Sequence, residues 1–332
     1  MSAFIDRKPS IDTQWRGIVL FGKNSATYKF AFGKALLKLA ENGLSSASLE
    51  TIAPLYADYI IDHIKEGNKQ GLSSSSTFLE GLNKYIEGRI SRDEVIQLTQ
   101  KFGFKNVIDA FHNVGTGSVP DKFYEFDAQS RVIHLDDNIL RLRGSEQGVN
   151  VAEEIEARWN LVETAWNLSL PISSVRIEAE RENEGLIITD GFGYRKPVTS
   201  TRNALSGYQR GKCFYSQRTI DLSSGDTDVD HFFPISKQEY HLPSNLNGVW
   251  NLVLAHSSLN RQKSAQAPAI RHLESLHKRN EYYISSKHPL GATIQMQTGQ
   301  SESQRREFLQ RHFDASKQYS FSGWEPDYIL RE

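Results

Sequence analysis

The sequence predicts an α+β protein in which a helical N-terminal domain precedes a region of short strands and helices. Two observations favour this class. Apolar residues recur at helical spacing through residues 14–115, and short β-prone runs alternate with helical segments farther on. With 332 residues, of which 38% are hydrophobic, the chain can form more than one core. We expect helical residues 1–115, a mixed segment over 116–195, and a domain over 196–332 that carries the candidate site and C-terminal helices.

The N-terminal helices are predicted from apolar spacing and from the residues that end them. One apolar face ends before Gly43, and a second, between Ile52 and Ile64, ends before Gly67. Further helices are expected over Ser76–Ile90 and Asp93–Lys101. The first face consists of Tyr28, Phe32, Leu36 and Leu39.

The mixed segment is predicted to hold a hairpin, a helix and two further strands. Phe123–Phe126 and Val132–Leu135 are separated by a polar turn, which is typical of a hairpin. Val151–Leu168 has helical spacing, and Val175–Ala179 and Leu186–Thr189 have the composition of strands. Nothing in this segment indicates a particular chemistry.

Composition limits the classes of function. The formal net charge is −1, so a nucleic-acid surface would have to be a local patch. Cys213 is the single cysteine, which excludes an intrachain disulfide and fits a reducing compartment. No apolar run is long enough to span a bilayer, and the charged N-terminus lacks the features of a secretory signal. We expect a cytoplasmic protein without a membrane partner.

Two basic stretches, residues 195–218 and 261–287, flank an acidic segment that contains histidine. The first has no acidic residue and the second has two. Either stretch alone could be ordinary solvated charge, but together they suggest a rim that binds phosphates. The candidate nucleic-acid contacts are Arg210, Lys212, Arg218, Arg261 and Lys263.

The segment between them carries the chemistry. Hydrolysis of a phosphodiester requires an activated water and neutralisation of charge on the phosphate. Asp230 offers a hard oxygen ligand for Mg²⁺ or Mn²⁺, and Asn260, near the start of a helix expected over residues 258–267, offers a second. His231 is the candidate base. Lys263 is placed to meet a phosphate, although it could equally be a solvated helix residue.

Asp230 and His231 are adjacent, and this imposes a condition on the backbone. In a regular strand their side chains would point to opposite faces, so a single site that uses both requires a bend at this point. Pro234 is consistent with a strand that ends soon afterwards. Considered alone, His231 would be a structural histidine; its place between an aspartate and Pro234 favours a catalytic role.

The pattern resembles the HNH, or ββα-metal, endonucleases. Their signature is Asp-His with Pro shortly after, then Asn before an apolar strand, then Asn-x-x-Lys at the start of a helix. Residues 228–231 (Asp-Val-Asp-His) and 260–263 (Asn-Arg-Gln-Lys) look especially like the HNH domain of CRISPR effector nucleases. The resemblance covers about residues 198–270.

Position by position, the resemblance implies a role for each of these residues. His231 would be the general base, and Asp230 and Asn260 would bind the metal. Asn251 would tie the loop together and orient the base, and Asp228 would be an auxiliary acid near the metal. Many relatives hold a structural zinc with two Cys-x-x-Cys pairs. Here those positions are Cys213, Ser216, His256 and Leu259, so we expect no zinc, with packing by Phe214, Tyr215, Trp250 and Leu252 in its place.

After the motif, helices are expected over His272–Ile284 and Ser303–Lys317, with a break at residues 288–290 (His-Pro-Leu) between them and with Phe308 and Phe313 buried. The arginines of the second helix, at 305, 306 and 311, could brace the domain or contact DNA. The function expected is metal-dependent nicking of DNA, with a role in restriction or anti-phage defence beside a helicase or other subunits. The alternatives are an inactive nuclease fold that only binds nucleic acid, and a nuclease that acts on RNA or tRNA.

Overall fold

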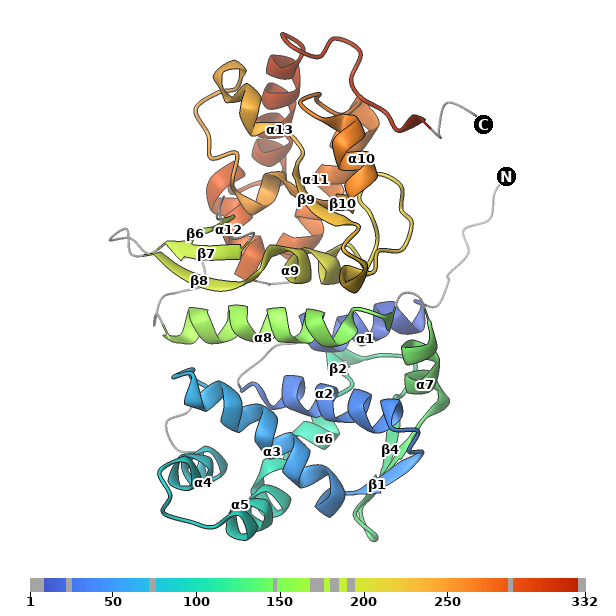
Figure 1. Cartoon of the computed structure of the whole chain (residues 1–332), viewed down its shortest axis with the longest axis vertical. Coiled ribbons are helices and arrows are strands. Elements are labelled where there is room, and N and C mark those ends of the chain that lie inside the picture. Colours follow the sequence, from blue (N-terminus) through green and yellow to red (C-terminus); the bar gives the residue numbers. More distant parts are fainter. Residues whose placement is uncertain are drawn as a thin grey trace. The chain divides into compact units, whose positions relative to one another are not determined.

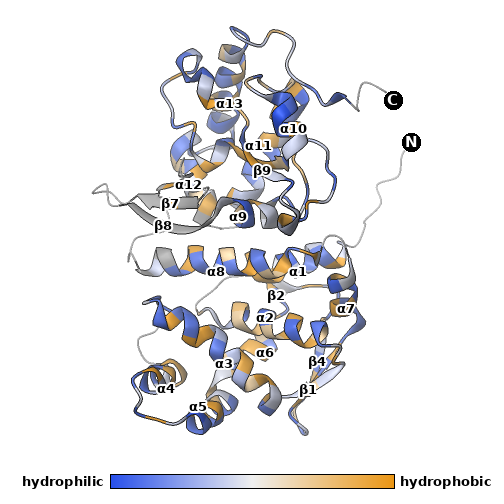
Figure 2. Cartoon of the chain, in the orientation of Figure 1, coloured by the Kyte–Doolittle hydropathy of each residue, from blue (hydrophilic) through white to orange (hydrophobic). Residues whose placement is uncertain are grey.

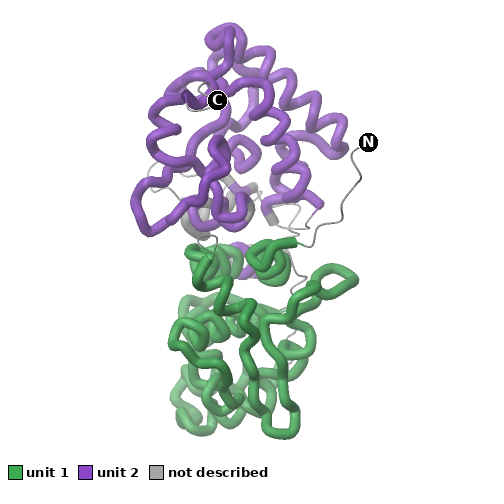
Figure 3. The backbone as a smooth tube through the Cα atoms, turned by 90° about the vertical axis from the view of Figure 1, so that its right-hand side faces the viewer, with its two compact units in different colours: residues 1–159 green, residues 160–332 purple. Residues whose placement is uncertain are grey.

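The computed structural model describes residues 9–21, 26–71, 76–145, 148–167, 176–179, 185–189, 195–285 and 289–327. The chain divides into two compact units, residues 1–159 and 160–332 (Figure 3). The boundary falls within helix α8 (Val151–Asn167), so the expected mixed segment contributes to both units. The α+β class agrees with the mixture of helices and small sheets, whereas the three-part division stays a prediction.

Unit 1 is mainly helical, and its helices begin where the sequence supplies capping side chains. Ser48 caps the third helix by accepting from the amide of Thr51, and Ser91 forms a capping box with Glu94. Besides α8, the helices are α1 (Ile11–Phe21), α2 (Tyr28–Glu41), α3 (Leu49–Lys65), α4 (Thr77–Ile86), α5 (Arg92–Leu98), α6 (Val107–Ala110) and α7 (Asp137–Gly144), with a π-helical turn at Thr99–Gly103.

The core of unit 1 is built on α2 and α3. Phe32 of α2 and Tyr56 of α3 are fully buried and meet edge to face, and the ring of Phe104 stacks on that of Tyr56. Figure 2 shows hydrophobic and hydrophilic residues alternating along these helices, as expected of amphipathic helices with one buried face.

The predicted hairpin is confirmed. Strands β4 (Tyr124–Asp127) and β5 (Val132–Leu135) pair antiparallel, with Phe126 opposite Ile133. A short strand that the sequence did not indicate, β1 (Ser46–Ser48), adds to the other edge of β5. A second small ladder joins β2 (Asn113–Val114) to β3 (Gly117–Ser118).

In unit 2, three antiparallel strands precede the segment with the candidate residues. The expected strands appear as β6 (Arg176–Ala179) and β7 (Gly185–Thr189), and β8 (Arg195–Ser200) extends the sheet beyond β7. Helix α9 (Thr201–Tyr208) follows β8 directly. The amide of Ile177 donates to the hydroxyl of Thr293, which ties this sheet to the C-terminal helices.

The remainder of unit 2 is a two-stranded ladder surrounded by helices (Figure 1). Its elements are β9 (Thr227–His231), β10 (Leu252–His256), α10 (Ser257–Lys263), α11 (Ile270–Ser285), α12 (Pro289–Thr298) and α13 (Glu302–Ser316), with 3₁₀ turns at Leu222–Ser224, Ile235–Tyr240 and Val249–Asn251. Helix α10 is shorter than expected, and α12 lies where we expected a break.

The C-terminal helices support the ladder. The guanidinium of Arg279 on α11 donates to the backbone carbonyls of Val249, Trp250 and Leu252. These bonds attach α11 to the turn before β10 and to the first residue of that strand. On α13, Arg305 forms a bidentate salt bridge with Glu281 of α11, so this arginine braces α11. The side chains of α13 that are buried are Arg305, Leu309, His312 and Ser316; the expectation that Phe308 and Phe313 are buried is wrong, because both are only half-buried.

Among the described helices, none combines the length and the apolar composition that crossing a bilayer requires.

Candidate active site

The candidate residues lie on a strand–strand–helix framework. Strand β9 pairs antiparallel with β10, so that Asp230 is opposite Val253 and His231 is opposite Leu252. Helix α10 begins at the residue after β10 and contacts both strands. The chain from 227 to 263 therefore places α10 beside β9 (Figure 1). Side chains of the two elements meet through hydrogen bonds.

The spacing of side chains along β9 and α10 explains why two residues of the strand contact two residues of the helix. Asp228 and Asp230 are two residues apart on β9, about 6.6 Å along a strand, and they share a face. Asn260 and Lys263 are three residues apart on α10, about 4.5 Å along a helix axis. Asn260 meets Asp228, and Lys263 meets Asp230.

Asp228 is half-buried, and the groups that donate to it in the described part of the chain are neutral. The hydroxyl of Ser257 donates to its Oδ1 at 2.8 Å, and the side-chain amide of Asn260 donates to its Oδ2 at 3.0 Å. Within the described residues, no lysine or arginine forms an ion pair with this carboxylate. Its negative charge is therefore not offset by a cationic side chain.

Asp230 is in a different environment. Its side chain is 7% exposed, and it accepts from the hydroxyl of Tyr215 at 2.5 Å and from the ammonium of Lys263 at 2.9 Å. Burial raises the pKa of Asp230 above its ordinary value, although the Lys263 ammonium and the Tyr215 hydroxyl act in the opposite direction. Burial together with the adjacent Asp230 raises the pKa of Tyr215 well above its usual range, so its hydroxyl stays a donor.

Lys263 lies deeper than the sequence indicated. Its side chain is 0% exposed, and its ammonium also donates to the backbone carbonyl of His231 at 2.8 Å. In this arrangement Lys263 does not reach solvent. The expectation that it contacts a phosphate and the alternative that it is a solvated helix residue therefore both differ from the structure. The physical reason is that Asp230 is buried, and a buried carboxylate requires a nearby cation.

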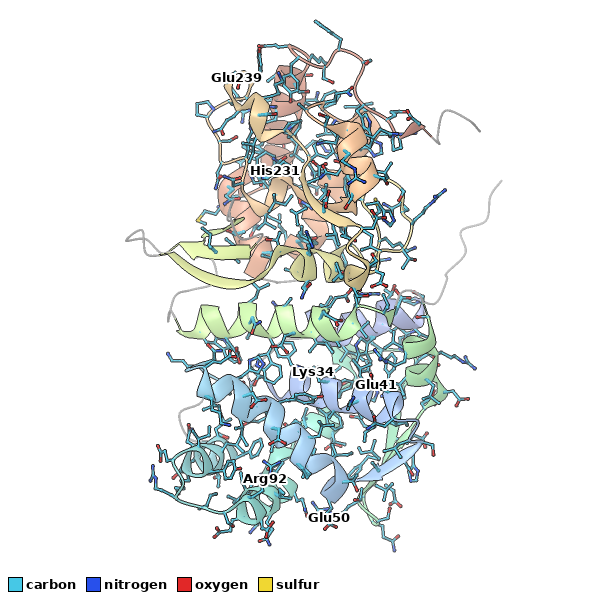
Figure 4. All side chains as sticks on the ribbon, viewed as in Figure 1. Lys34, Glu41, Glu50, Arg92, His231 and Glu239 are labelled. Atoms are coloured by element: carbon cyan, nitrogen blue, oxygen red, sulfur yellow. The ribbon has the colours of Figure 1, made fainter. Side chains whose placement is uncertain are left out.

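His231 is the last residue of β9 and is half-buried (Figure 4). Its Nε2 lies 3.2 Å from Oδ1 of Asn247. An amide oxygen can only accept, so in the neutral imidazole this contact favours the tautomer that carries its proton on Nε2. The bend that we expected at Asp230–His231 comes later, at Phe232 and Phe233, because the ladder continues through His231.

Asn251 is fully buried, and its side chain bonds only to backbone. Its amide donates to the carbonyls of Phe233 and Leu246, and its Oδ1 accepts from the amide of Phe233. These bonds join both ends of the loop between β9 and β10. The side chain of Asn247 contacts the imidazole, and Asn251 holds the backbone of the loop that carries Asn247.

Cys213 and His256, at the positions where relatives carry zinc ligands, lie close together. The backbone amide of His256 lies 3.5 Å from the sulfur of Cys213, which is fully buried. The aromatic residues expected to pack here are also buried: Tyr215 meets Phe214 and Trp324 edge to face.

Of the remaining basic candidates, Arg210, Arg218 and Arg261 are exposed and Lys212 is half-buried. Arg210 and Lys212 line one pocket of unit 2, whereas Arg218 and Arg261 do not line it.

The donor set suits a hard divalent cation. Asp228, Asp230 and Asn260 present carboxylate and amide oxygens at the junction of β9 and α10, and oxygen ligands are those that Mg²⁺ and Mn²⁺ prefer. Within the described segments, no three histidine, cysteine, aspartate or glutamate side chains gather as a metal cluster, and here the third oxygen donor is an asparagine. The uncompensated charge of Asp228 is the feature that fits a cation.

Three functional contacts were not indicated by the sequence: Tyr215 with Asp230, Asn247 with His231, and Ser257 with Asp228. Tyr215 was expected to pack, and no motif distinguishes Asn247 from other loop asparagines. Ser257 had a possible signal, because it lies one turn before Asn260 on the face that meets β9.

Residues 213–269 match the family model described as HNH endonuclease. This span includes β9, β10, α10 and the site side chains from Cys213 to Lys263, whereas Arg210 and Lys212 lie just before it. The chain therefore carries an HNH-family nuclease domain over these residues. No match was found among curated proteins.

Proposed function

Because residues 213–269 form an HNH-family nuclease domain, we propose that the chain is a metal-dependent endonuclease that hydrolyses phosphodiester bonds of DNA. The observation that carries the proposal is the junction of β9 and α10, where Asp228 meets Asn260 and Asp230 meets Lys263, and where β9 ends at His231, whose Nε2 lies 3.2 Å from Oδ1 of Asn247. These are the groups that phosphodiester hydrolysis requires.

In the proposed reaction, His231 accepts a proton from the attacking water at Nδ1. The contact with Asn247 keeps the imidazole in the tautomer that can do so. Burial of Asp230 beside Lys263 holds the end of β9 against α10, which fixes the backbone of His231 through its carbonyl. Asn251 fixes the loop that follows.

Asp228, Asp230 and Asn260 would hold the cation, either Mg²⁺ or Mn²⁺. A divalent ion bound there would offset charge on the scissile phosphate and stabilise the departing 3′ oxygen. The chain's own contribution is to place three oxygen donors on adjoining faces of two short elements. One such site cuts one strand, so nicking is the expected product.

The test is conversion of supercoiled plasmid to the nicked form by the full chain, with Mg²⁺ or Mn²⁺ and with a chelator. His231→Ala should lower the rate by about a hundredfold or more, as expected for loss of a general base. His134→Ala, an exposed histidine of β5 in unit 1, is the matched control. Equal activity of wild type and His231→Ala would overturn the proposal.

The same experiment separates the alternatives. An inactive fold that only binds nucleic acid would retain a DNA without cutting it under any metal condition. A nuclease for structured RNA or tRNA would cut an RNA of matched sequence in preference to the DNA. By its resemblance to stand-alone bacterial HNH proteins, we further propose a role in restriction or anti-phage defence with a helicase or other subunits.

A further inference from the structure

A basic pocket of about 610 Å³ lies within unit 2, and the candidate metal ligands and His231 are not part of its lining. One wall is the turn after α9, which carries Arg210 and Lys212. The other wall is α11, which carries Arg271, Lys278 and Arg279. Among the described residues that line the pocket, none is an aspartate or a glutamate. The two basic stretches of the sequence, on either side of the motif, thus converge on one cavity.

Both walls are held in place by the fold. On α11, Arg271, Ser275, Lys278 and Tyr282 follow one another at steps of four, three and four residues, so they share one face of the helix. The turn that forms the other wall is tied to β10, because the side-chain amide of Gln209 donates to the carbonyl of Leu254 at 2.8 Å, and the amide of Phe214 donates to the same carbonyl.

The positive charge of the pocket is only partly neutralised. Arg271 pairs with Glu325 at 3.1 Å, and Lys278 lies 4.0 Å from Glu274. For Arg210, Lys212 and Arg279, no ion pair with a carboxylate is seen within the described part of the chain. Arg279 is buried and bonds only to backbone carbonyls and Asn280. An anion in the pocket would therefore meet Arg210 and Lys212, which have no carboxylate partner within the described residues, whereas the guanidinium of Arg279 is already engaged by carbonyl oxygens.

A buried histidine adds a second, independent sign of a ligand. His272 lines the pocket and is 6% exposed. Its Nε2 is buried and has no hydrogen-bond partner within the described residues. Buried polar nitrogens are nearly always paired, so this nitrogen lacks a partner that a bound ligand could supply. Its ring packs edge to face against Tyr215, which fixes its orientation.

We infer that this pocket binds the phosphate of a nucleotide, either free or within a DNA strand. The volume lies in the range of small-molecule pockets, about 300–1,000 Å³. The guanidinium of Arg210 lies 5.7 Å from the ring of Tyr282, and this pair offers a flat surface on which a base can stack. The inference requires no cleavage, so it stands apart from the proposed nuclease activity.

The test measures binding by the full chain in the presence of EDTA, so that neither metal nor cleavage contributes. The probes are ATP, followed by calorimetry, and a short fluorescein-labelled oligothymidylate, followed by anisotropy. The charge variant is Lys212→Glu with Lys278→Glu. Its matched control is Lys237→Glu with Lys317→Glu, which likewise reverses the charge of one half-buried lysine and one exposed lysine of unit 2, both outside the pocket.

A second variant fills the pocket without changing its charge. Ser275→Tyr adds a ring on the lining face of α11, and Ser285→Tyr adds the same ring on that helix outside the pocket. Both serines are exposed, and the hydroxyl of each donates to a carbonyl of its own helix, so both variants should fold.

The pocket variants should weaken binding by about tenfold or more, while each control stays within about twofold of wild type. Binding of ATP that competes with the oligonucleotide identifies a free nucleotide as ligand; binding of the oligonucleotide alone identifies a DNA strand. The inference is overturned if neither probe binds at millimolar concentration, or if the control variants lose as much affinity as the pocket variants.

Discussion

The ion pair between Lys263 and Asp230 provides the sharpest test of the described geometry. Replacing Lys263 with methionine keeps a long unbranched side chain but removes the one cation that contacts the Asp230 carboxylate in the described residues. Both side chains are buried, at 0% and 7% exposed. Removing one partner of such a pair costs about 3–5 kcal/mol, because the other charge stays buried without compensation. We expect the free energy of unfolding of unit 2 to fall by this amount at neutral pH.

The loss should depend on pH with a defined sign. The folded-state pKa of Asp230 is raised by burial, and loss of Lys263 raises it further. A carboxyl whose pKa is higher in the folded state binds its proton more readily there, so protonation favours folding and stability is lost as pH rises through the folded pKa. The destabilisation by Lys263→Met should therefore be largest at neutral pH and smaller near about pH 4.

The assay is hydrogen exchange of β9 and α10 peptides in the full chain with a chelator present, because these peptides report on unit 2 alone. Lys278→Met is the control: this lysine of α11 is 75% exposed, and the variant should stay within about 0.5 kcal/mol of wild type. Asp230→Asn together with Lys263→Met should cost less than the sum of the single changes. A loss below about 1 kcal/mol for Lys263→Met would refute the buried pair, because exposed pairs contribute no more than that.

Three further predictions concern the supports of the site and a second buried pair. Tyr215→Phe should destabilise unit 2 by about 1–3 kcal/mol, because the buried Asp230 carboxylate loses a donor while the ring packing remains. A free energy of unfolding in urea equal to that of wild type would contradict this contact. Asn251→Ala should cost about 3 kcal/mol, because one backbone amide and two carbonyls lose their partners, and it should increase hydrogen exchange at the amide of Phe233. Unchanged exchange at that amide would show that the loop is held by other means. His241 and His312 are buried, and their Nδ1 atoms lie 3.1 Å apart. Burial lowers the pKa of each to about 4, so the folded protein binds fewer protons than the unfolded chain, and its stability should fall as pH drops from about 6.5 to about 4. His312→Leu should reduce that pH dependence in urea unfolding, and an unaltered pH dependence would exclude the histidine pair as its cause.

The ladder and α10 could be predicted because their sequence pattern is local. The alternation in residues 228–231 and the spacing of Asn260 and Lys263 encode a strand face and a helix face. The partners of Asp230 could not be predicted in the same way. The contact with Tyr215 depends on how the turn after α9 packs against β9, and no periodicity records that packing.

The errors in the fold have physical reasons of the same kind. Pro289 was interpreted as a break, yet it is the first residue of α12, where a missing amide costs nothing. Strand β8 contains Pro197 and was overlooked, but it lies at the edge of its sheet, where proline is tolerated. Strand β1 has only small residues and forms through its pairing with β5.

The central claim is that side chains of β9 and α10 share the cation used for cleavage. The most direct measurement is the rate of plasmid nicking against Mg²⁺ concentration for wild type and Asn260→Ala, with Gln262→Ala as the control on the exposed side of the same helix. We predict that Asn260→Ala needs about tenfold or more Mg²⁺ for half-maximal rate, or loses activity by that factor, while Gln262→Ala follows wild type. Superimposable curves for wild type and Asn260→Ala would contradict the claim.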